Sequence, residues 1–264
     1  MRTWFLAMLA GCAGAEAMSS PTAQPQAAPF ELGLYPGETM SYEVRLGGVL
    51  VGEAQLAVGE IGIVEGRTAL VVKSRAATAG AAALVKNLVD ESTTVVEIAT
   101  GRPLRVDTTV VTNAERRTIA ARFSDRGPNV DLTLQTGDQR PQHLTLIQTA
   151  TLYDMHTAMA QIRTWRAPPG TSQTLALIGG RRMWQVEVRY VGEDTIGSNV
   201  GNRRAVIYDG ASYRADRTGK RTSSTPTRTF RVWLSDDADR VPLKCVARTE
   251  LGDIVMDLTE YARP

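Results

Sequence analysis

The sequence predicts a mainly β fold: a large antiparallel, strongly curved sheet or open barrel-like domain with two short helices. The prediction rests first on residues 230–261, where apolar and polar residues alternate in three successive runs. A period of two is typical of strands with one buried and one solvated face. Turn-forming residues at 235–239 and 251–253 separate the runs and leave no room for a helix. The same pattern recurs along most of the chain, so we expect one large sheet.

Length and composition agree with a single β-rich domain over residues 30–264. The chain has 264 residues and a hydrophobic content of 43%, which is enough for a packed core. The formal net charge is only +2 and aromatic residues make up 6%. The net positive charge is too small to attract nucleic acid, and aromatic side chains that could stack on bases are few. We therefore expect no nucleic-acid partner.

The first 12 residues have the features of a signal peptide. Arg2 precedes a short apolar run at 4–10, which is too short to span a membrane. The run ends in Leu9-Ala10-Gly11-Cys12, which resembles a bacterial lipobox. In that scheme Cys12 receives the lipid and becomes the first residue of the mature protein. The alternative is ordinary secretory cleavage after Ala17, at an A-x-A site.

Residues 13–29 are rich in Ala, Ser, Pro and Gln and have little to bury, so they predict a flexible tether. A random coil of that length reaches roughly 20–25 Å. We therefore expect an exported lipoprotein, anchored in a membrane through Cys12 and facing the periplasm, with the outer membrane preferred. A soluble periplasmic or secreted protein is the alternative.

The first half of the domain predicts a hairpin and then a helix. Strands at 42–46 and 50–58 are joined by a Gly-Gly turn, and Gly52 indicates a bulge or a close backbone approach. A third strand follows at 70–72. Residues 81–89 lack the period of two and are rich in helix formers, which predicts a short helix. Further strands are expected at 94–98, 104–110, 119–123, 130–134, 174–178, 184–190 and 204–208.

A second helix is predicted from Asp154 to Trp165. Asp154 is placed to cap it, and Met155, Met159 and Ile162 fall on one apolar face. Helices inside a long antiparallel series suggest that they plug the mouth or edge of a curved sheet. Because methionine adapts its shape, these three residues are candidates for an apolar ligand face, with ordinary core packing as the favoured alternative.

Three other features are expected to have no catalytic or metal-binding role. Cys245 is in phase with buried strand positions and predicts an inert thiol, free unless it pairs with an unlipidated Cys12. The polar stretch 209–228 predicts a disordered loop, with contact to envelope phosphate groups as the alternative. The acidic run 236–239 lacks the spacing of a calcium loop and predicts a solvated turn.

The sequence contains no recognisable catalytic or cofactor motif. Neither His143 nor His156 lies in a metal-ligand spacing, and a satisfied or solvent-facing role is favoured for both. The chain has no G-x-S-x-G elbow, Walker loop or dinucleotide fingerprint. We therefore predict no enzyme activity, no cofactor and no metal site.

Several short motifs follow one another along the domain: Gly37-Glu38, Tyr42-x-Val44, Gly52-x-Ala54, the helix opened by Asp154, Gly192-Glu193, Val232-Trp233-Leu234-Ser235, Val241-Pro242-Leu243 and Gly252. Their order and spacing resemble the DUF3108 family of exported bacterial envelope proteins. That resemblance covers residues 34–261 and implies a β-rich domain and no catalytic residues.

Together these features predict a non-enzymatic envelope lipoprotein whose curved sheet binds an apolar ligand, such as a lipid, or an envelope protein. A purely structural envelope module with a fully packed concave face is the first alternative. A hydrolase of envelope polymers, with carboxylates converging in a cleft, is the second.

Overall fold

The computed structural model describes residues 32–124, 129–147, 150–216, 218–222 and 227–264. The predicted signal peptide, Cys12 and the tether 13–29 lie outside these residues. In the described part, sixteen strands form one sheet and two helices accompany it, which confirms the predicted fold class. Neither helix is long and apolar enough to cross a membrane.

The first half of the chain contains α1 (Gly80–Val85) and nine strands. They are β1 (Thr39–Leu46), β2 (Val49–Val58), β3 (Gly62–Val64), β4 (Arg67–Thr78), β5 (Leu88–Glu97), β6 (Pro103–Thr112), β7 (Arg116–Phe123), β8 (Val130–Thr136) and β9 (Gln142–Leu146). The second half contains α2 (Met155–Thr164) and seven strands. They are β10 (Leu152–Tyr153), β11 (Ser172–Gly179), β12 (Arg182–Ser198), β13 (Gly201–Ala215), β14 (Arg228–Ser235), β15 (Pro242–Thr249) and β16 (Gly252–Ala262).

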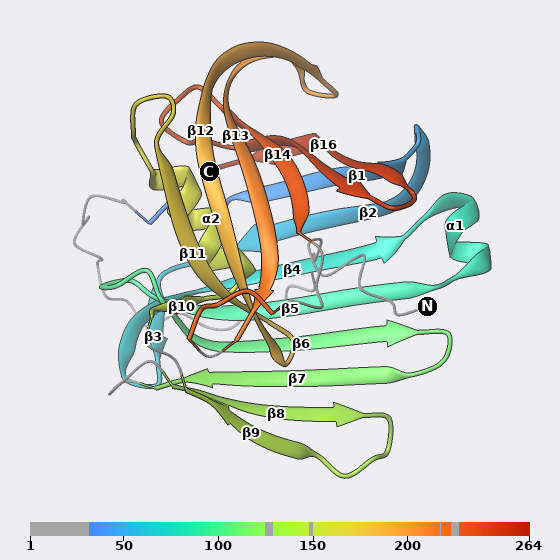
Figure 1. The fold of residues 1–264 in the computed structure, drawn as a ribbon, viewed down its shortest axis with the longest axis vertical. Coiled ribbons are helices and arrows are strands. Elements are labelled where there is room, and N and C mark those ends of the chain that lie inside the picture. The colour runs from blue at the N-terminus through green and yellow to red at the C-terminus, as the bar shows by residue number, and fades with distance from the viewer. Residues whose placement is uncertain (1–31, 125–128, 148–149, 217, 223–226) are drawn as a thin grey trace.

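The sheet is continuous but not closed. Its order runs β10-β11-β12-β13-β14-β15-β16-β1-β2-β4-β5-β6-β7-β8-β9, with β3 paired to β4 alone. All pairs are antiparallel except the two-residue β10–β11 pair. Because β1 pairs with β16, the two ends of the domain meet in the middle of the sheet. Figure 1 shows β11–β14 arching across the layer formed by β1, β2 and β4–β9.

Helix α2 lies inside this curved sheet and is buried on two sides. Ala158 and Ile162 pack against side chains of β11–β14, whereas Ala160 packs against Val72 and Val96 on β4 and β5. Beyond the helix, side chains of β6–β8 meet those of β10–β12 directly. The curvature therefore encloses the helix between β11–β14 on one side and β4 and β5 on the other (Figure 1).

Local sequence explains why α2 begins and ends where it does. The Asp154 carboxylate accepts hydrogen bonds from the backbone N–H groups of His156 and Thr157, and the Thr157 hydroxyl accepts one from the Asp154 N–H. This capping box satisfies N–H groups that the first turn leaves free. The helix ends at Thr164, ahead of the Pro168-Pro169 pair. The predicted helix Asp154–Trp165 is confirmed.

The predicted hairpin is also confirmed, with Leu46 opposite Val49 across the Gly-Gly turn. A Cβ atom at Gly52 would meet the carbonyl oxygen of Ala77 at 2.9 Å. Glycine is therefore required there by the close approach of β4, one of the two roles expected for it.

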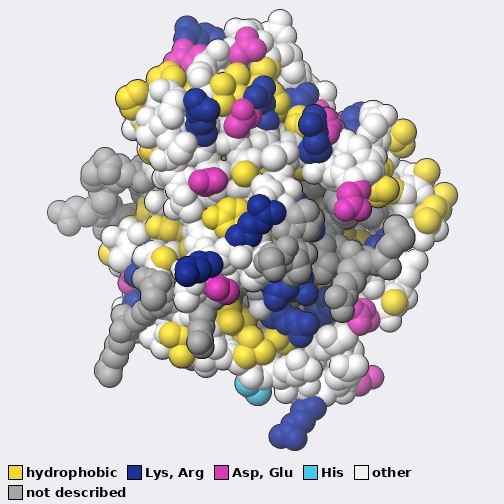
Figure 2. Space-filling view, viewed as in Figure 1, with side chains coloured by type: hydrophobic (Ala, Val, Ile, Leu, Met, Phe, Trp, Pro, Cys, Tyr) yellow, Lys and Arg dark blue, Asp and Glu magenta, His cyan; other side chains and the backbone are white. Residues whose placement is uncertain are grey.

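The first helix is much shorter than its sequence predicts. Helix α1 covers only Gly80–Val85, and Leu88 to Asp90 belong to β5. The reason is tertiary: β4 and β5 pair as far as Ala77 and Val89, and this ladder overrides the helix propensity of the alanine run. Helix α1 thus becomes a connector at the rim, where its hydrophobic side chains Leu84 and Val85 are 89% and 84% exposed. Figure 2 shows hydrophobic side chains on the surface at this edge of the molecule.

Part of the stretch predicted as a disordered loop is strand. Residues 209–215 continue β13 and pair with β14 as far as Ser212 and Arg228. Arg231 forms a bidentate ion pair with Asp209 across this pair, at 2.6 and 2.8 Å. The prediction was wrong here because small and polar residues, including the buried Ser212, face inward and hide the period of two.

Candidate functional site: a cavity between helix α2 and the sheet

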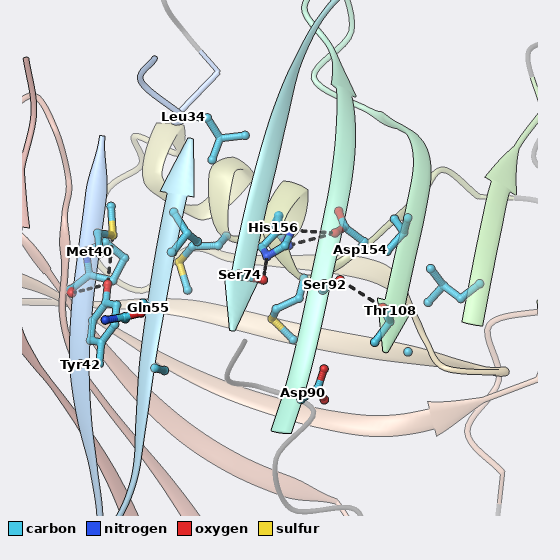
Figure 3. A pocket seen from close by; sticks show the side chains of 18 of the residues that line it. Leu34, Met40, Tyr42, Gln55, Ser74, Asp90, Ser92, Thr108, Asp154 and His156 are labelled. Atoms are coloured by element: carbon cyan, nitrogen blue, oxygen red, sulfur yellow. Dashed lines mark hydrogen bonds and ion pairs between the residues drawn. The ribbon is translucent and has the colours of Figure 1, made fainter. Parts of the chain in front are cut away.

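A cavity of about 190 Å³ lies between α2 and the concave face of the sheet (Figure 3). Four of the chain's eight methionines line it, from β1, α2 and β16. Leu34 and Leu56 add to this apolar wall. At about 30 Å³ per water molecule, the volume corresponds to roughly six waters or a short alkyl chain. The methionines are Met40, Met155, Met159 and Met256.

A row of hydroxyl groups crosses the floor of the cavity. Ser74 on β4 is directly opposite Ser92 on β5, and Ser92 is directly opposite Thr108 on β6. The Ser92 and Thr108 hydroxyls are hydrogen-bonded at 3.1 Å. All three residues line the cavity. A ligand would therefore meet neutral hydrogen-bonding groups on one side and flexible apolar side chains on the other.

His156 lies at one end of this row in a buried hydrogen-bond network. The Thr94 hydroxyl donates to Oδ2 of Asp154 at 2.5 Å, so its oxygen is free to accept from Nδ1 of His156 at 2.7 Å. Nε2 then carries no proton and accepts a hydrogen bond from the Ser74 hydroxyl. Burial lowers the pKa of His156, which keeps the ring neutral. The network attaches the start of α2 to β4 and β5, so the expectation of a satisfied histidine is confirmed.

Asp90 lies on β5 one inward position beyond Ser92, and its side chain lines the cavity (Figure 3). The residue is 7% exposed, and the described residues provide no hydrogen bond or ion pair to its carboxyl group. Its cross-strand neighbours are Ala76 and Val110, which cannot compensate a charge. Burial, with a smaller effect of Glu91, raises the pKa of Asp90 to about 7.

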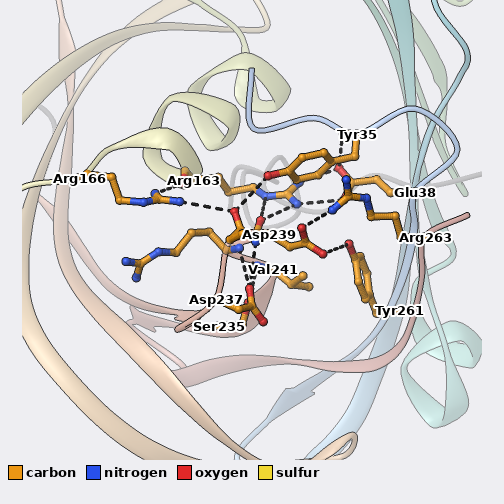
Figure 4. Close-up of polar contacts among 12 residues, drawn as sticks. Tyr35, Glu38, Arg163, Arg166, Ser235, Asp237, Asp239, Val241, Tyr261 and Arg263 are labelled. Atoms are coloured by element: carbon orange, nitrogen blue, oxygen red, sulfur yellow. Dashed lines mark hydrogen bonds and ion pairs between the residues drawn. The ribbon is translucent and has the colours of Figure 1, made fainter. Parts of the chain in front are cut away.

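A second buried polar cluster fixes the other end of α2 (Figure 4). Arg163 donates to the two carboxylate oxygens of Glu38 at 2.7 and 2.9 Å, and their side chains are 2% and 0% exposed. The same guanidinium donates to the backbone carbonyl of Asp239 at 2.9 and 3.2 Å. These contacts join the N-terminal segment, the helix and the β14–β15 turn.

The acidic run 236–239 has more structure than the solvated turn predicted for it. Asp237 is exposed as expected, but its carboxylate accepts hydrogen bonds from the Ser235 hydroxyl and from the N–H groups of Asp239 and Arg240. The Asp239 carboxylate accepts from the Tyr261 hydroxyl at 3.3 Å. These hydrogen bonds order the turn and so position the backbone carbonyl of Asp239, which accepts hydrogen bonds from Arg163.

The three residues of the predicted apolar face pack against one core cluster, but only two of them line the cavity. Met155 and Met159 border the cavity, whereas Ile162 is 6% exposed and lies within the core against β11–β14. Cys245 is partly exposed and contacts the same core, and burial raises the pKa of its thiol to about 12. That shift agrees with an inert thiol, because the thiolate is the reactive form.

Sequence reasoning missed the polar lining of the cavity. A signal was present: Asp90, Ser92 and Thr94 share the phase of the buried Val96 and so occupy the inward face of β5. Assigning residues up to 89 to a helix concealed that phase. Among the described residues, no group of three or more His, Cys, Asp or Glu side chains is placed to hold a metal ion.

A solved structure with a TM-score above 0.5 shows the fold. The β-barrel-like protein of domain of unknown function DUF1849 from Brucella abortus has a TM-score of 0.57 and 7% identity, covering 88% of this chain and 99% of its own. The hypothetical lipoprotein YmcC from Escherichia coli has a TM-score of 0.30 and 12% identity, covering 91% and 92%. None of the curated proteins matches the chain.

A family model described as a protein of unknown function, DUF3108, matches residues 41–259. The match covers most of the described domain, from β1 to β16. It confirms the resemblance carried by the turn and strand motifs. The chain therefore belongs to the DUF3108 family.

Proposed function

We propose that this protein is a non-enzymatic ligand-binding module of the bacterial envelope, with the cavity beneath α2 as its binding site. The observation that carries the proposal is a cavity of about 190 Å³ lined by four methionines inside the curved sheet. Ligand sites are usually concave and apolar with a few polar groups, and methionine adapts to varied apolar shapes. The ligand class is an amphiphile with an alkyl chain.

The envelope assignment is supported by the N-terminal sequence. The apolar run and the Leu9-Ala10-Gly11-Cys12 motif favour a lipid anchor at Cys12, and residues 13–29 favour a tether. A tethered domain with an amphiphile site would face the periplasm, at the outer membrane in the preferred form of the proposal. A partner in the envelope would then deliver or receive the ligand.

Cys12→Ser is expected to move the protein from the membrane fraction into the soluble periplasmic fraction, because the serine hydroxyl cannot replace the lipid-bearing thiol. Fractionation of cells expressing the full chain, followed by immunoblotting, measures this. Cys245→Ser, at the chain's other cysteine, is the control and should remain in the membrane fraction. Unchanged membrane association of Cys12→Ser, with a mature N-terminus directly after Ala17, would contradict the anchor.

Met159→Trp tests the cavity. The larger side chain should occupy the space beneath α2 and weaken binding of the neutral dye N-phenyl-1-naphthylamine at least tenfold. Overpacking costs about 1–3 kcal/mol, so the fold should persist. Met159→Leu is the matched control, since a volume-conserving change leaves the cavity open. If the wild-type protein binds no dye at all, the purely structural module replaces the binding proposal.

A second candidate function, hydrolysis of an acyl ester, is favoured by one observation. The Ser74 hydroxyl donates to Nε2 of His156, and Oδ2 of Asp154 lies 3.4 Å from Nδ1. This is the order of nucleophile, base and carboxylate in serine hydrolases. Ser74 Oγ would add to the ester carbonyl, while His156 takes its proton and passes it to the departing alcohol. Water would then release the acid.

A fluorophosphonate probe distinguishes the two functions. The binding proposal expects no covalent adduct, because it assigns the Ser74–His156 hydrogen bond to holding α2 on the sheet. Mass spectrometry of the labelled protein provides the measurement. Ser92→Ala is the matched control, since Ser92 lines the same cavity and its hydroxyl is hydrogen-bonded to Thr108 instead. An adduct at Ser74 that Ser74→Ala loses and Ser92→Ala keeps would establish the hydrolase instead.

A further inference from the structure

Asp90 differs from the other buried carboxyl groups in the described part of the chain. Glu38 is bound by the two terminal nitrogens of Arg163, and Asp154 accepts from backbone N–H groups and from Thr94. Both carboxylates therefore have partners within the chain, and their hydrogen bonds stabilise the fold. Asp90 is also buried, at 7% exposed against 0% for Glu38 and 3% for Asp154, yet the described residues provide no hydrogen bond or ion pair to its carboxyl group. A buried carboxyl group without a partner is costly, so a partner from outside the chain would stabilise it.

Among the described residues, no cation around Asp90 could serve as its partner. Arg163 also borders the cavity, but its guanidinium is occupied by Glu38 and by the Asp239 carbonyl. Glu91 alternates to the exposed side of β5, where it pairs with Arg75. The described residues that line this wall of the cavity therefore supply no free positive group for Asp90.

We propose that the cavity takes an amphiphile whose polar end is an ammonium group, which the Asp90 carboxylate binds while the alkyl chain lies against the methionines. The inference rests on the function proposed above and names its ligand class. Ser92 and Thr108, next along the hydroxyl row, would accept the remaining ammonium hydrogens. An ammonium ion has three donors and no acceptor, which fits a carboxylate beside hydroxyl oxygens.

Binding of such a ligand is coupled to ionisation of Asp90. The ammonium group favours the carboxylate form, so affinity should rise with pH up to about 7 and then level off. Among the described residues, no other group facing this position should produce that profile. Ala76 and Val110 flank it on β4 and β6, and His156, which lines the cavity from α2, is kept neutral by burial.

Three ligands with one chain length and different head groups test the inference: octylamine, octanol and octanoate. Each displaces N-phenyl-1-naphthylamine from the folded full-length domain, and the melting temperature of each variant is checked first. At pH 8 the wild-type protein is expected to bind octylamine at least tenfold more tightly than octanol, and octanoate most weakly. Asp90→Asn should lose the preference for the amine and keep octanol binding. Glu91→Gln, at the neighbouring outward position, should keep the preference.

The outcomes separate the two proposals. Equal binding of octylamine and octanol by the wild-type protein would overturn the ammonium site while the amphiphile site stands. Tighter binding of octanoate, or an amine preference that survives in Asp90→Asn, would overturn it as well. Failure of the dye and of all three ligands to bind would remove the proposed function itself.

Discussion

Arg163→Met is expected to lower the free energy of unfolding by about 3–5 kcal/mol, because it leaves the Glu38 carboxylate buried without its partner. The loss should be large for this chain, since Glu38 is fully buried and Arg163 also holds the Asp239 carbonyl. Urea unfolding followed by circular dichroism measures it. Methionine fills a similar length of space, so lost packing contributes little.

Two further variants isolate the cause of this loss. The double variant Glu38→Leu/Arg163→Met removes the stranded charge and should recover part of the stability, as replacement of buried pairs by apolar residues often does. Arg231→Met breaks the exposed pair with Asp209, whose side chains are both 45% exposed, and should cost less than about 1 kcal/mol. Equal losses in Arg163→Met and Arg231→Met would show that the buried pair has no special role.

Asp90→Asn is expected to raise the free energy of unfolding at pH 8 by about 2–4 kcal/mol. The folded-state pKa of Asp90 is about 7, against an ordinary value of 3.8. A shift of that size corresponds to about 4 kcal/mol at about 1.4 kcal/mol per pKa unit, as an upper figure. The asparagine amide keeps a neutral polar group in the same place, so the variant removes mainly the penalty of burying a charge.

The pH dependence has a definite sign. Below pH 4, Asp90 is protonated in both the folded and the unfolded states, and the variant should gain little. Between pH 4 and pH 7 the unfolded chain releases this proton before the folded protein does, so the wild type loses stability as pH rises. Above pH 7 the difference becomes constant. Asp107→Asn, at an exposed carboxylate paired with Arg105, is the control and should show no such profile. A gain for Asp90→Asn that is the same at pH 4 and pH 8 would contradict the raised pKa.

These two predictions describe opposite uses of a buried carboxylate in one domain. Glu38 is neutralised within the chain and contributes to stability. Asp90 has no partner among the described residues at the wall of the cavity, and its charged form is expected to reduce stability at neutral pH. Perturbed groups of this second kind concentrate at functional sites, where a ligand supplies the missing interaction. The stability gain expected for Asp90→Asn is therefore the counterpart of the binding loss expected for it.

The sequence by itself determined the features that depend on neighbours along the chain. Alternation of apolar and polar residues identified the strands, and the Gly-Gly pair identified the first hairpin. Asp154 and the residues after it specified where α2 begins, because a capping box involves only four consecutive residues. The order of turn motifs was enough to indicate the DUF3108 family. These features are local, and short patterns encode them directly.

The tertiary structure alone decided which of these surfaces meet and where they leave a space. Pairing of β4 with β5 reduced the alanine-rich helix to α1, and pairing of β13 with β14 drew residues 209–215 into the sheet. Curling of the sheet around α2 left a cavity beside Met155 and Met159 but not beside Ile162, although all three pack against one core cluster. It also brought Ser74 and Thr94 to His156 across 82 and 62 residues.

A periodic pattern predicts that a side chain points inward. Whether that side chain then meets another side chain or a cavity depends on strands that are distant in sequence. Asp90 points inward by its phase on β5, and only the curvature of the whole sheet leaves its carboxyl group facing a cavity without a partner.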